Sequence, residues 1–148
     1  MKSKGKQKPL IYLASPYSHK HKHVRAYRED YVCAMAAYLI LKGHHIYCPI
    51  AETVSVEKHG KFTSAWAFWR DIDLHKLEKC DELWIAGVDG WEKSSGVQGE
   101  LKFALNRQYK ISLVWFKSIE YDVIIKRTLS NDSILKRLKL AGVHELGD

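Results

Sequence analysis

The sequence has no apolar run close to the roughly 18 residues that a membrane-spanning helix needs. The basic segment 1–9 is not followed by the long apolar stretch of a secretory signal peptide. Cysteine is scarce: Cys33, Cys48 and Cys80 are an odd number without close spacing, which argues against a disulfide framework or a zinc site. We therefore expect a cytoplasmic protein without a structural metal.

Several motifs of well-known chemistry are also missing. The chain contains no Walker loop, no GxGxxG, no GxSxG and no HExxH. His19, His21 and His23 suggest a metal site, but they alternate with lysines and have no carboxylate or cysteine at ligand spacing. A solvated loop is the simpler interpretation, and the sequence indicates neither a metal nor a cofactor.

The composition indicates one folded domain. The 148 residues include five Trp and eight Tyr, and 46% of them are hydrophobic, which is enough for one core. The net charge of +7 has three interpretations: a surface for nucleic acid, attraction of small anionic substrates, or solvated tail and helix faces. Composition alone does not support nucleic-acid binding, and we expect no such partner.

Hydrophobic periodicity predicts strands that alternate with helices. Short apolar runs predict strands at 10–14, 45–48, 83–88 and 111–116. A 3.6-residue spacing predicts helices at 24–42, 65–79, 97–108 and 131–140, and Gly43 stands where a helix should end. Residues 50–64 have no strong pattern, so we expect a loop there, with at most a short helix.

This alternation predicts an α/β fold: a Rossmann-like, flavodoxin-like parallel sheet with helices on both faces. We divide the chain into a flexible basic tail (1–9), an α/β domain (10–116) and a C-terminal helical extension of that domain (117–148). In such sheets the ligand lies beyond the carboxyl ends of the strands. The loops after Ala14, Cys48 and Val88 should therefore meet at one site.

The loop that precedes the third predicted helix is the richest in candidate residues. Ser94, Ser95 and Gly96 lead into a helix whose free amides and dipole favour an anion, and glycine permits its close approach. Glu100 follows in the first turn, where the dipole should keep it ionised, as a carboxylate nucleophile requires. Ser-Ser-Gly followed by an early Glu is also an ordinary capping pattern, which is the simpler interpretation of this segment taken alone.

Two further side chains are candidate catalytic residues, and each also has an ordinary structural interpretation. Asp73 follows Trp69 by four residues, so it can lie beside aromatic side chains and act as a proton donor. It is also explained as a solvated residue paired with Arg70 or Lys76. Tyr12 lies inside the first predicted strand, where a tyrosine usually belongs to the core with its hydroxyl at the edge.

Four segments, in this order, resemble the nucleoside 2-deoxyribosyltransferase superfamily. They are Ile11–Tyr17 (IYLASPY), Trp69–Asp73 (WRDID), Cys80–Trp84 (CDELW), and Ser94–Leu101 (SSGVQGEL) with Ala104. The resemblance covers roughly residues 10–116 and is greatest to a bacterial and phage branch with a Leu-Ala-Ser-Pro-Tyr first strand. It also extends to nucleoside 5′-monophosphate N-glycosidases.

The resemblance implies a role for each matched position. Glu100 is the nucleophile that forms a glycosyl-enzyme ester, Tyr12 orients it, and Asp73 handles the base or its leaving-group proton. Ser94 stands where the hydrolases have a phosphate-binding serine and the base-exchanging transferases have Asp. Candidate substrate contacts come from the loops: Ser15, Pro16, Tyr17, Gly90, Trp91, Ser94, Ser95 and Gly96.

These roles predict hydrolysis of the N-glycosidic bond of a nucleoside or deoxynucleoside 5′-monophosphate. Base exchange by a deoxyribosyltransferase, or a catalytically silent nucleotide-binding module, remain alternatives. The first loop, Pro16–Lys20, lacks the Arg-Gly pair of the hydrolases. The resemblance also implies a homodimer or a larger homo-oligomer and requires no metal or cofactor.

Overall fold

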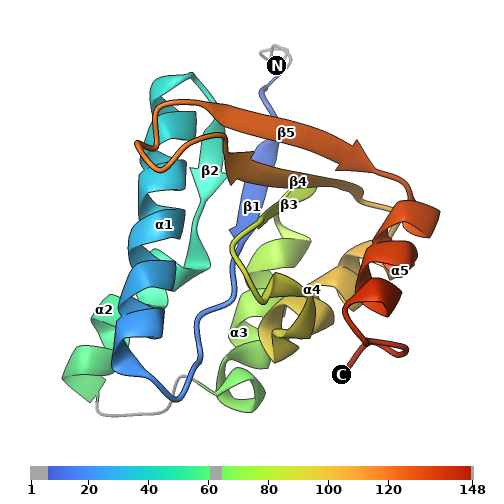
Figure 1. Cartoon of the computed structure of the whole chain (residues 1–148), viewed down its shortest axis with the longest axis horizontal. Helices are drawn as coiled ribbons and strands as arrows, with labels where there is room; N and C mark the ends of the chain where they lie inside the picture. Colours follow the sequence, from blue (N-terminus) through green and yellow to red (C-terminus); the bar gives the residue numbers. More distant parts are fainter. Residues whose placement is uncertain (1–6, 61–64, 148) are drawn as a thin grey trace, which may run out of the picture.

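The computed structural model describes residues 7–60 and 65–147, and within them five strands form one sheet (Figure 1). The strand order is β2-β1-β3-β4-β5; β1 to β4 are parallel, and β5 pairs antiparallel with β4. The strands are β1 Leu10–Ala14, β2 His45–Tyr47, β3 Glu82–Ala86, β4 Lys110–Phe116 and β5 Ile124–Leu129. The predicted Rossmann-like α/β class is confirmed.

The helices cover both faces of this sheet. They are α1 Lys22–Leu41, α2 Pro49–Gly60, α3 Trp66–Glu78, α4 Ser95–Asn106 and α5 Asn131–Leu140, with a short 3-10 helix η1 at Trp91–Lys93. Helix α1 packs on one face, and α3, α4 and α5 pack on the other (Figure 1). Strand β1 shows why: Ile11 and Leu13 point toward α1, whereas Tyr12 and Ala14 belong to the opposite core. Apolar residues at every position suit a strand that is covered on both faces.

The order in which successive strands are added to the sheet reverses between β1 and β3. Strand β2 is added on one side of β1, and β3 is added on the other. Because crossovers between parallel strands are right-handed, this reversal sends α1 and α3 to opposite faces. The helices consequently diverge at the carboxyl ends of β1 and β3, which is where sheets of this kind bind their ligands.

Two segments differ from the sequence prediction. Helix α2 occupies twelve residues where a loop with at most a short helix was expected, and its start is explained by Pro49, whose fixed φ suits the first turn of a helix. Strand β5 lies inside 117–148, so the prediction of a purely helical extension is wrong there. Most of its residues are at least partly exposed, as suits an edge strand, and its short pattern is ambiguous.

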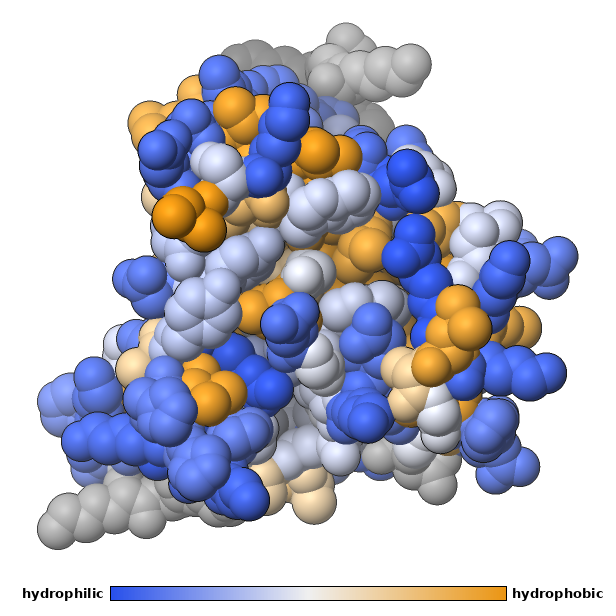
Figure 2. Space-filling model, viewed as in Figure 1, coloured by the Kyte–Doolittle hydropathy of each residue, from blue (hydrophilic) through white to orange (hydrophobic). Residues whose placement is uncertain are grey.

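The predicted flexible tail falls largely on residues 1–6, which lie outside the described part of the chain. In the two described ranges, no helix combines the length and apolar character needed to cross a bilayer. Hydrophilic residues cover most of the face shown in Figure 2, and apolar residues reach the surface there in several small separate places.

The C-terminal extension contributes to the same core as the rest of the chain. Ile134 is completely buried between α5 and the sheet, while its neighbour Leu135 is 53% exposed. We expect Ile134→Ala to lower the free energy of unfolding by about 2–5 kcal/mol, because it leaves a cavity in that core. Leu135→Ala should change it by less than about 1 kcal/mol. Urea denaturation measures both, and equal small effects would show that α5 is dispensable for folding.

Candidate active site

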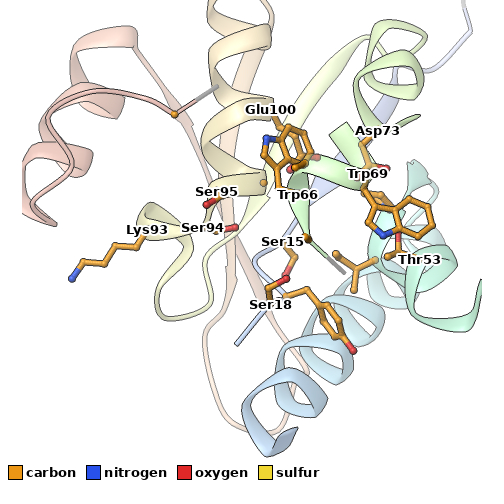
Figure 3. Close-up of a pocket in the computed structure, with 17 residues that line it drawn as sticks. Ser15, Ser18, Thr53, Trp66, Trp69, Asp73, Lys93, Ser94, Ser95 and Glu100 are labelled. Carbon is orange, nitrogen blue, oxygen red and sulfur yellow. The ribbon is translucent and has the colours of Figure 1, made fainter. Parts of the chain in front are cut away.

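A cavity of about 590 Å³ opens at the carboxyl ends of β1 and β2, beside the loop that follows β3 (Figure 3). Its walls come from the loop after β1, from helices α2, α3 and α4, from the segment before α4, and from the C-terminal segment. The lining residues are Ser15, Tyr17, Ser18, Pro49, Ile50, Thr53, Ala65, Trp66, Ala67, Trp69, Asp73, Lys93, Ser94, Ser95, Gly96, Glu100 and Gly147. The cavity therefore lies where the reversal of the sheet predicts a ligand site.

Glu100 is the most deeply buried ionisable residue that lines this cavity. Helix α4 is anchored by Val97, Leu101 and Ala104, all fully buried, and it holds Glu100 at 4% exposure. Burial raises the pKa of Glu100 to about 8; the Tyr12 hydroxyl lowers this pKa, and the Asp73 carboxylate raises it. At pH 7 the carboxyl is therefore mostly protonated, so the expectation that the helix dipole keeps it ionised is wrong for the protein by itself.

Tyr12 is a close neighbour of Glu100, because each of the two groups shifts the pKa of the other. Its side chain is fully buried, and burial together with the charges of Glu100 and Asp73 raises the pKa of its hydroxyl well above the ordinary value. The hydroxyl acts on Glu100 electrostatically, yet it has no partner at ordinary hydrogen-bond geometry among the described residues. A buried phenol without a partner is costly, and the loose contact is of the kind that tightens when a substrate binds.

Asp73 supplies the second carboxyl of the cavity from helix α3. Burial raises its pKa to about 6; Lys76 lowers this pKa, and Glu52 raises it. The expected partners are engaged elsewhere: Lys76 Nζ lies 2.7 Å from Glu52 Oε2, and Arg70 pairs weakly with Asp71 at 3.9 Å. Within the described ranges Asp73 has no ion pair or hydrogen bond, so its carboxyl remains available to a ligand.

The network around Glu52 keeps Lys76 from Asp73. Glu52 Oε2 accepts hydrogen bonds from Tyr47 Oη at 2.8 Å and from Lys76 Nζ at 2.7 Å. Both interactions lower the pKa of Glu52 and so hold it ionised. Because Lys76 is bound to Glu52, its charge lowers the pKa of Asp73 by less than burial raises it.

Trp66 lies beside Glu100 because two glycines leave room for its ring (Figure 3). A Cβ at Gly99 would be only 2.4 Å from Trp66 Cζ2, so any larger residue would displace the indole. A Cβ at Gly96 would meet the same ring at an ordinary 3.5 Å. Glycine is unfavourable inside a helix, so helix formation does not account for Gly99. Its role is to leave space for the Trp66 ring.

The N-terminus of α4 forms the wall opposite Asp73. Ser94 is the N-cap of this helix, and its Oγ accepts a hydrogen bond from the Val97 amide at 3.3 Å. The amides of Ser95 and Gly96 have no hydrogen-bond acceptor within the part of the chain that the structure describes. Two free amides, a serine hydroxyl and the helix dipole together favour an anion at this wall.

The structure brings most of the predicted site residues together. Seven of them line the cavity: Ser15, Tyr17, Asp73, Ser94, Ser95, Gly96 and Glu100. Tyr12 lies beneath it, and Pro16 is buried without lining it. Gly90 and Trp91 line a different cavity instead, because η1 turns the Trp91 side chain into the core, where it is 4% exposed.

Sequence reasoning did not assign several residues of the wall: Ser18, Ile50, Thr53, Trp66, Trp69 and Lys93. Ile50 and Thr53 belong to α2, which has too short a pattern to be recognised as a helix. The two tryptophans were visible in the sequence only as part of an amphipathic helix. Lys93 reaches the edge of the cavity, and its amino group points away from Glu100 (Figure 3).

Metal-binding side chains do not gather in this cavity. Across residues 7–60 and 65–147, no group of three or more His, Cys, Asp or Glu side chains is arranged to hold a metal ion. Near the start of α1 the rings of His21 and His23 stack with centroids 5.4 Å apart, and the His19 ring is tilted against that of His21 at 5.3 Å. The site therefore offers two carboxyls, a phenol, aromatic rings and an anion-binding helix end.

The raised pKa of Glu100 predicts a pH-dependent stability. A carboxyl whose pKa is about 8 in the folded chain, against about 4.3 when unfolded, stabilises the fold below pH 4 and loses this contribution as the pH rises through 8. Glu100→Gln should thus be more stable than the wild type at pH 9, on the order of a few kcal/mol, and should differ little at pH 4.5. Thermal and urea unfolding at the two pH values measure this.

The matched control for this prediction is Glu120→Gln, at an exposed position in the loop after β4. Its effect on stability should be small at both pH values. A Glu100→Gln difference that is the same at pH 4.5 and pH 9 would contradict the assigned pKa.

Comparison with known proteins gives a family for this chain. A family model described as a domain of unknown function (DUF1937) matches residues 9–116. This range extends from β1 to β4 and contains every residue of the cavity wall except Gly147, while β5 and α5 lie outside it. No curated protein matches the chain. The match covers well over half of the sequence, and the chain therefore belongs to the DUF1937 family.

Proposed function

We propose that this protein is an N-glycosidase that hydrolyses the N-glycosidic bond of a nucleoside or deoxynucleoside 5′-monophosphate. The observation that carries the proposal is that Glu100 and Asp73 line one cavity and that the buried Tyr12 interacts with both, although the three residues come from three different elements. The resemblance of four sequence segments to the nucleoside 2-deoxyribosyltransferase superfamily supports the same assignment. We expect the enzyme to be cytoplasmic and homo-oligomeric.

The chemistry is a double displacement. A Glu100 oxygen attacks the anomeric carbon as the bond between that carbon and the base nitrogen breaks, and Asp73 transfers its proton to the departing base. Water then attacks the same carbon, the bond to Glu100 breaks, and the Asp73 carboxylate takes the proton of that water. The products are a free base and a sugar 5-phosphate, and both carboxyls return to their starting state.

The two carboxyls must be in opposite protonation states for the first step. Glu100 has to be ionised and Asp73 protonated, whereas pKa values of about 8 and about 6 favour the reverse at pH 7. The reactive form is a minor species that is most populated midway between these values, because the two groups titrate as a coupled pair. The positive charge that develops on the sugar stabilises the Glu100 carboxylate in the transition state.

The two ends of the cavity suit the two ends of a nucleotide. The α4 N-terminus, with Ser94, Ser95 and Gly96, is a phosphate site of familiar type. On the other side, Trp66 and Trp69 offer aromatic surface for a planar base, close to Asp73 (Figure 3). A nucleotide laid in this direction places its sugar at Glu100.

Release of free base tests the proposed reaction. The full chain, incubated with a panel of nucleoside and deoxynucleoside 5′-monophosphates, should release base that chromatography detects. Glu100→Gln should reduce the rate at least about a thousandfold because the nucleophile is lost, and Asp73→Asn about a hundredfold or more because the proton donor is lost. Asp71→Asn is the matched control, since Asp71 lies on the same helix with a 97% exposed side chain.

Other outcomes separate the alternatives. Base exchange after addition of a second base would identify a transferase. Nucleotide binding without release of any base from the whole panel would contradict the enzymatic proposal and favour a binding module. Undiminished release by Glu100→Gln would remove the proposed nucleophile.

Substitutions at Ser94 test the phosphate end without removing the helix cap. Ser94→Asp keeps an excellent N-cap but introduces a negative charge, and Ser94→Gly removes the hydroxyl at a cost of only a few tenths of a kcal/mol. We expect Ser94→Asp to lower kcat/KM for the monophosphate about tenfold or more, and Ser94→Gly to lower it less. The corresponding nucleoside should be affected little by either. Equal losses for monophosphate and nucleoside would refute phosphate recognition at Ser94.

A further inference from the structure

A second cavity of about 410 Å³ lies on the same face of the sheet, between the loop after β3, strands β4 and β5, and helix α5. Its lining residues are Gly87, Val88, Asp89, Gly90, Trp91, Glu92, Leu113, Trp115, Arg127 and Arg137. None of them lines the candidate active site. Along the chain, residues 87–92 line the second cavity and residues 93–96 line the candidate active site.

Arg127 stands at an unusual position of β5. It pairs in register with Leu113 of β4, and Leu129, two residues on, is buried in the core. Alternate residues of a strand point to the same face, so Arg127 is on the same face of β5 as the buried Leu129. Arg127 is nevertheless exposed, so the charge of its guanidinium is solvated and remains open to a ligand.

Arg137 approaches the same cavity from helix α5. It follows the buried Ile134 by three residues and directly precedes the buried Leu138, which places it at the margin of the helix face that packs on the sheet. Two arginines from separate elements thus line one cavity.

Neither guanidinium has an ion pair or a hydrogen bond within the described ranges, although Asp89 and Glu92 line the cavity as well. Two cations that share a cavity repel each other, and an anion between them removes this repulsion. Each guanidinium presents a planar set of donors that matches the oxygens of a phosphate group. Gly87 and Gly90 line the same cavity; Gly87 packs closely against Leu113 and Trp115, and the Arg28 guanidinium lies close to Gly90.

We propose that this second cavity binds a small phosphate-bearing anion between Arg127 and Arg137. The site is separate from the candidate active site and does not depend on the proposed hydrolysis. The half-buried ring of Trp115 is a further contact for a ligand larger than phosphate itself.

Calorimetric titration with inorganic pyrophosphate, in a buffer without phosphate, tests the proposal. The titration uses the full chain with Ser94→Asp, because the added carboxylate weakens binding of the probe at the α4 N-terminus. Binding should be retained in this protein and should weaken about tenfold or more for each arginine that is replaced by alanine. Arg127→Lys should recover only part of the loss, because lysine keeps the charge but not the two-pronged geometry.

The matched control replaces Lys136 and Lys139, two exposed residues of α5 that do not line this cavity, by alanine. This pair removes the same charge as the two arginines. An equal loss of binding in the lysine and arginine variants would mean non-specific attraction and would overturn the proposal, as would the absence of binding in the Ser94→Asp protein. A parallel titration with AMP separates the sources: tighter binding than pyrophosphate identifies a nucleotide, and weaker binding a free phosphate compound.

Discussion

The burial of the Glu100 carboxyl is the constraint on which the site depends. Among the described residues, the groups that act on its pKa are the Tyr12 hydroxyl and the Asp73 carboxylate, and neither carries a positive charge. The folded protein consequently holds an acid that resists ionisation, at a free-energy cost that the rest of the fold must offset. A ligand that develops positive charge beside Glu100 relieves this cost, and it relieves more of it in the transition state than in the ground state.

Several elements hold this carboxyl in place or shape its surroundings. Helix α4 carries it and packs into the core through Val97, Leu101 and Ala104. Gly99 lets Trp66 lie against the same helix, and the indole lies beside Glu100 (Figure 3). Helix α2 supplies Glu52, which binds Lys76 and leaves Asp73 without a neutralising partner. The long connection between β2 and β3 thus provides one wall of the cavity and, through α3, its second acid.

The loop between β3 and α4 connects two sites of different chemistry. Its last residues expose free amides to the acidic cavity, while its first residues face the cavity of Arg127 and Arg137. Trp91, buried between them, fixes the loop to the core through α5 and the sheet. A ligand in either cavity therefore contacts the same loop, at one end or the other. This loop physically connects the two sites.

The sequence alone determined the α/β class, the helices at α1 and α3 to α5, and the candidate acids Glu100 and Asp73, because periodicity, end signals and short motifs are local properties. Only the tertiary structure decided that Lys76 binds Glu52 rather than Asp73, that Trp66 covers Gly99, and that Trp91 turns away from the acids. It also decided the protonation of Glu100: the local helix dipole favours the charged form, but burial by residues distant in the chain favours the neutral one, and burial is the larger effect.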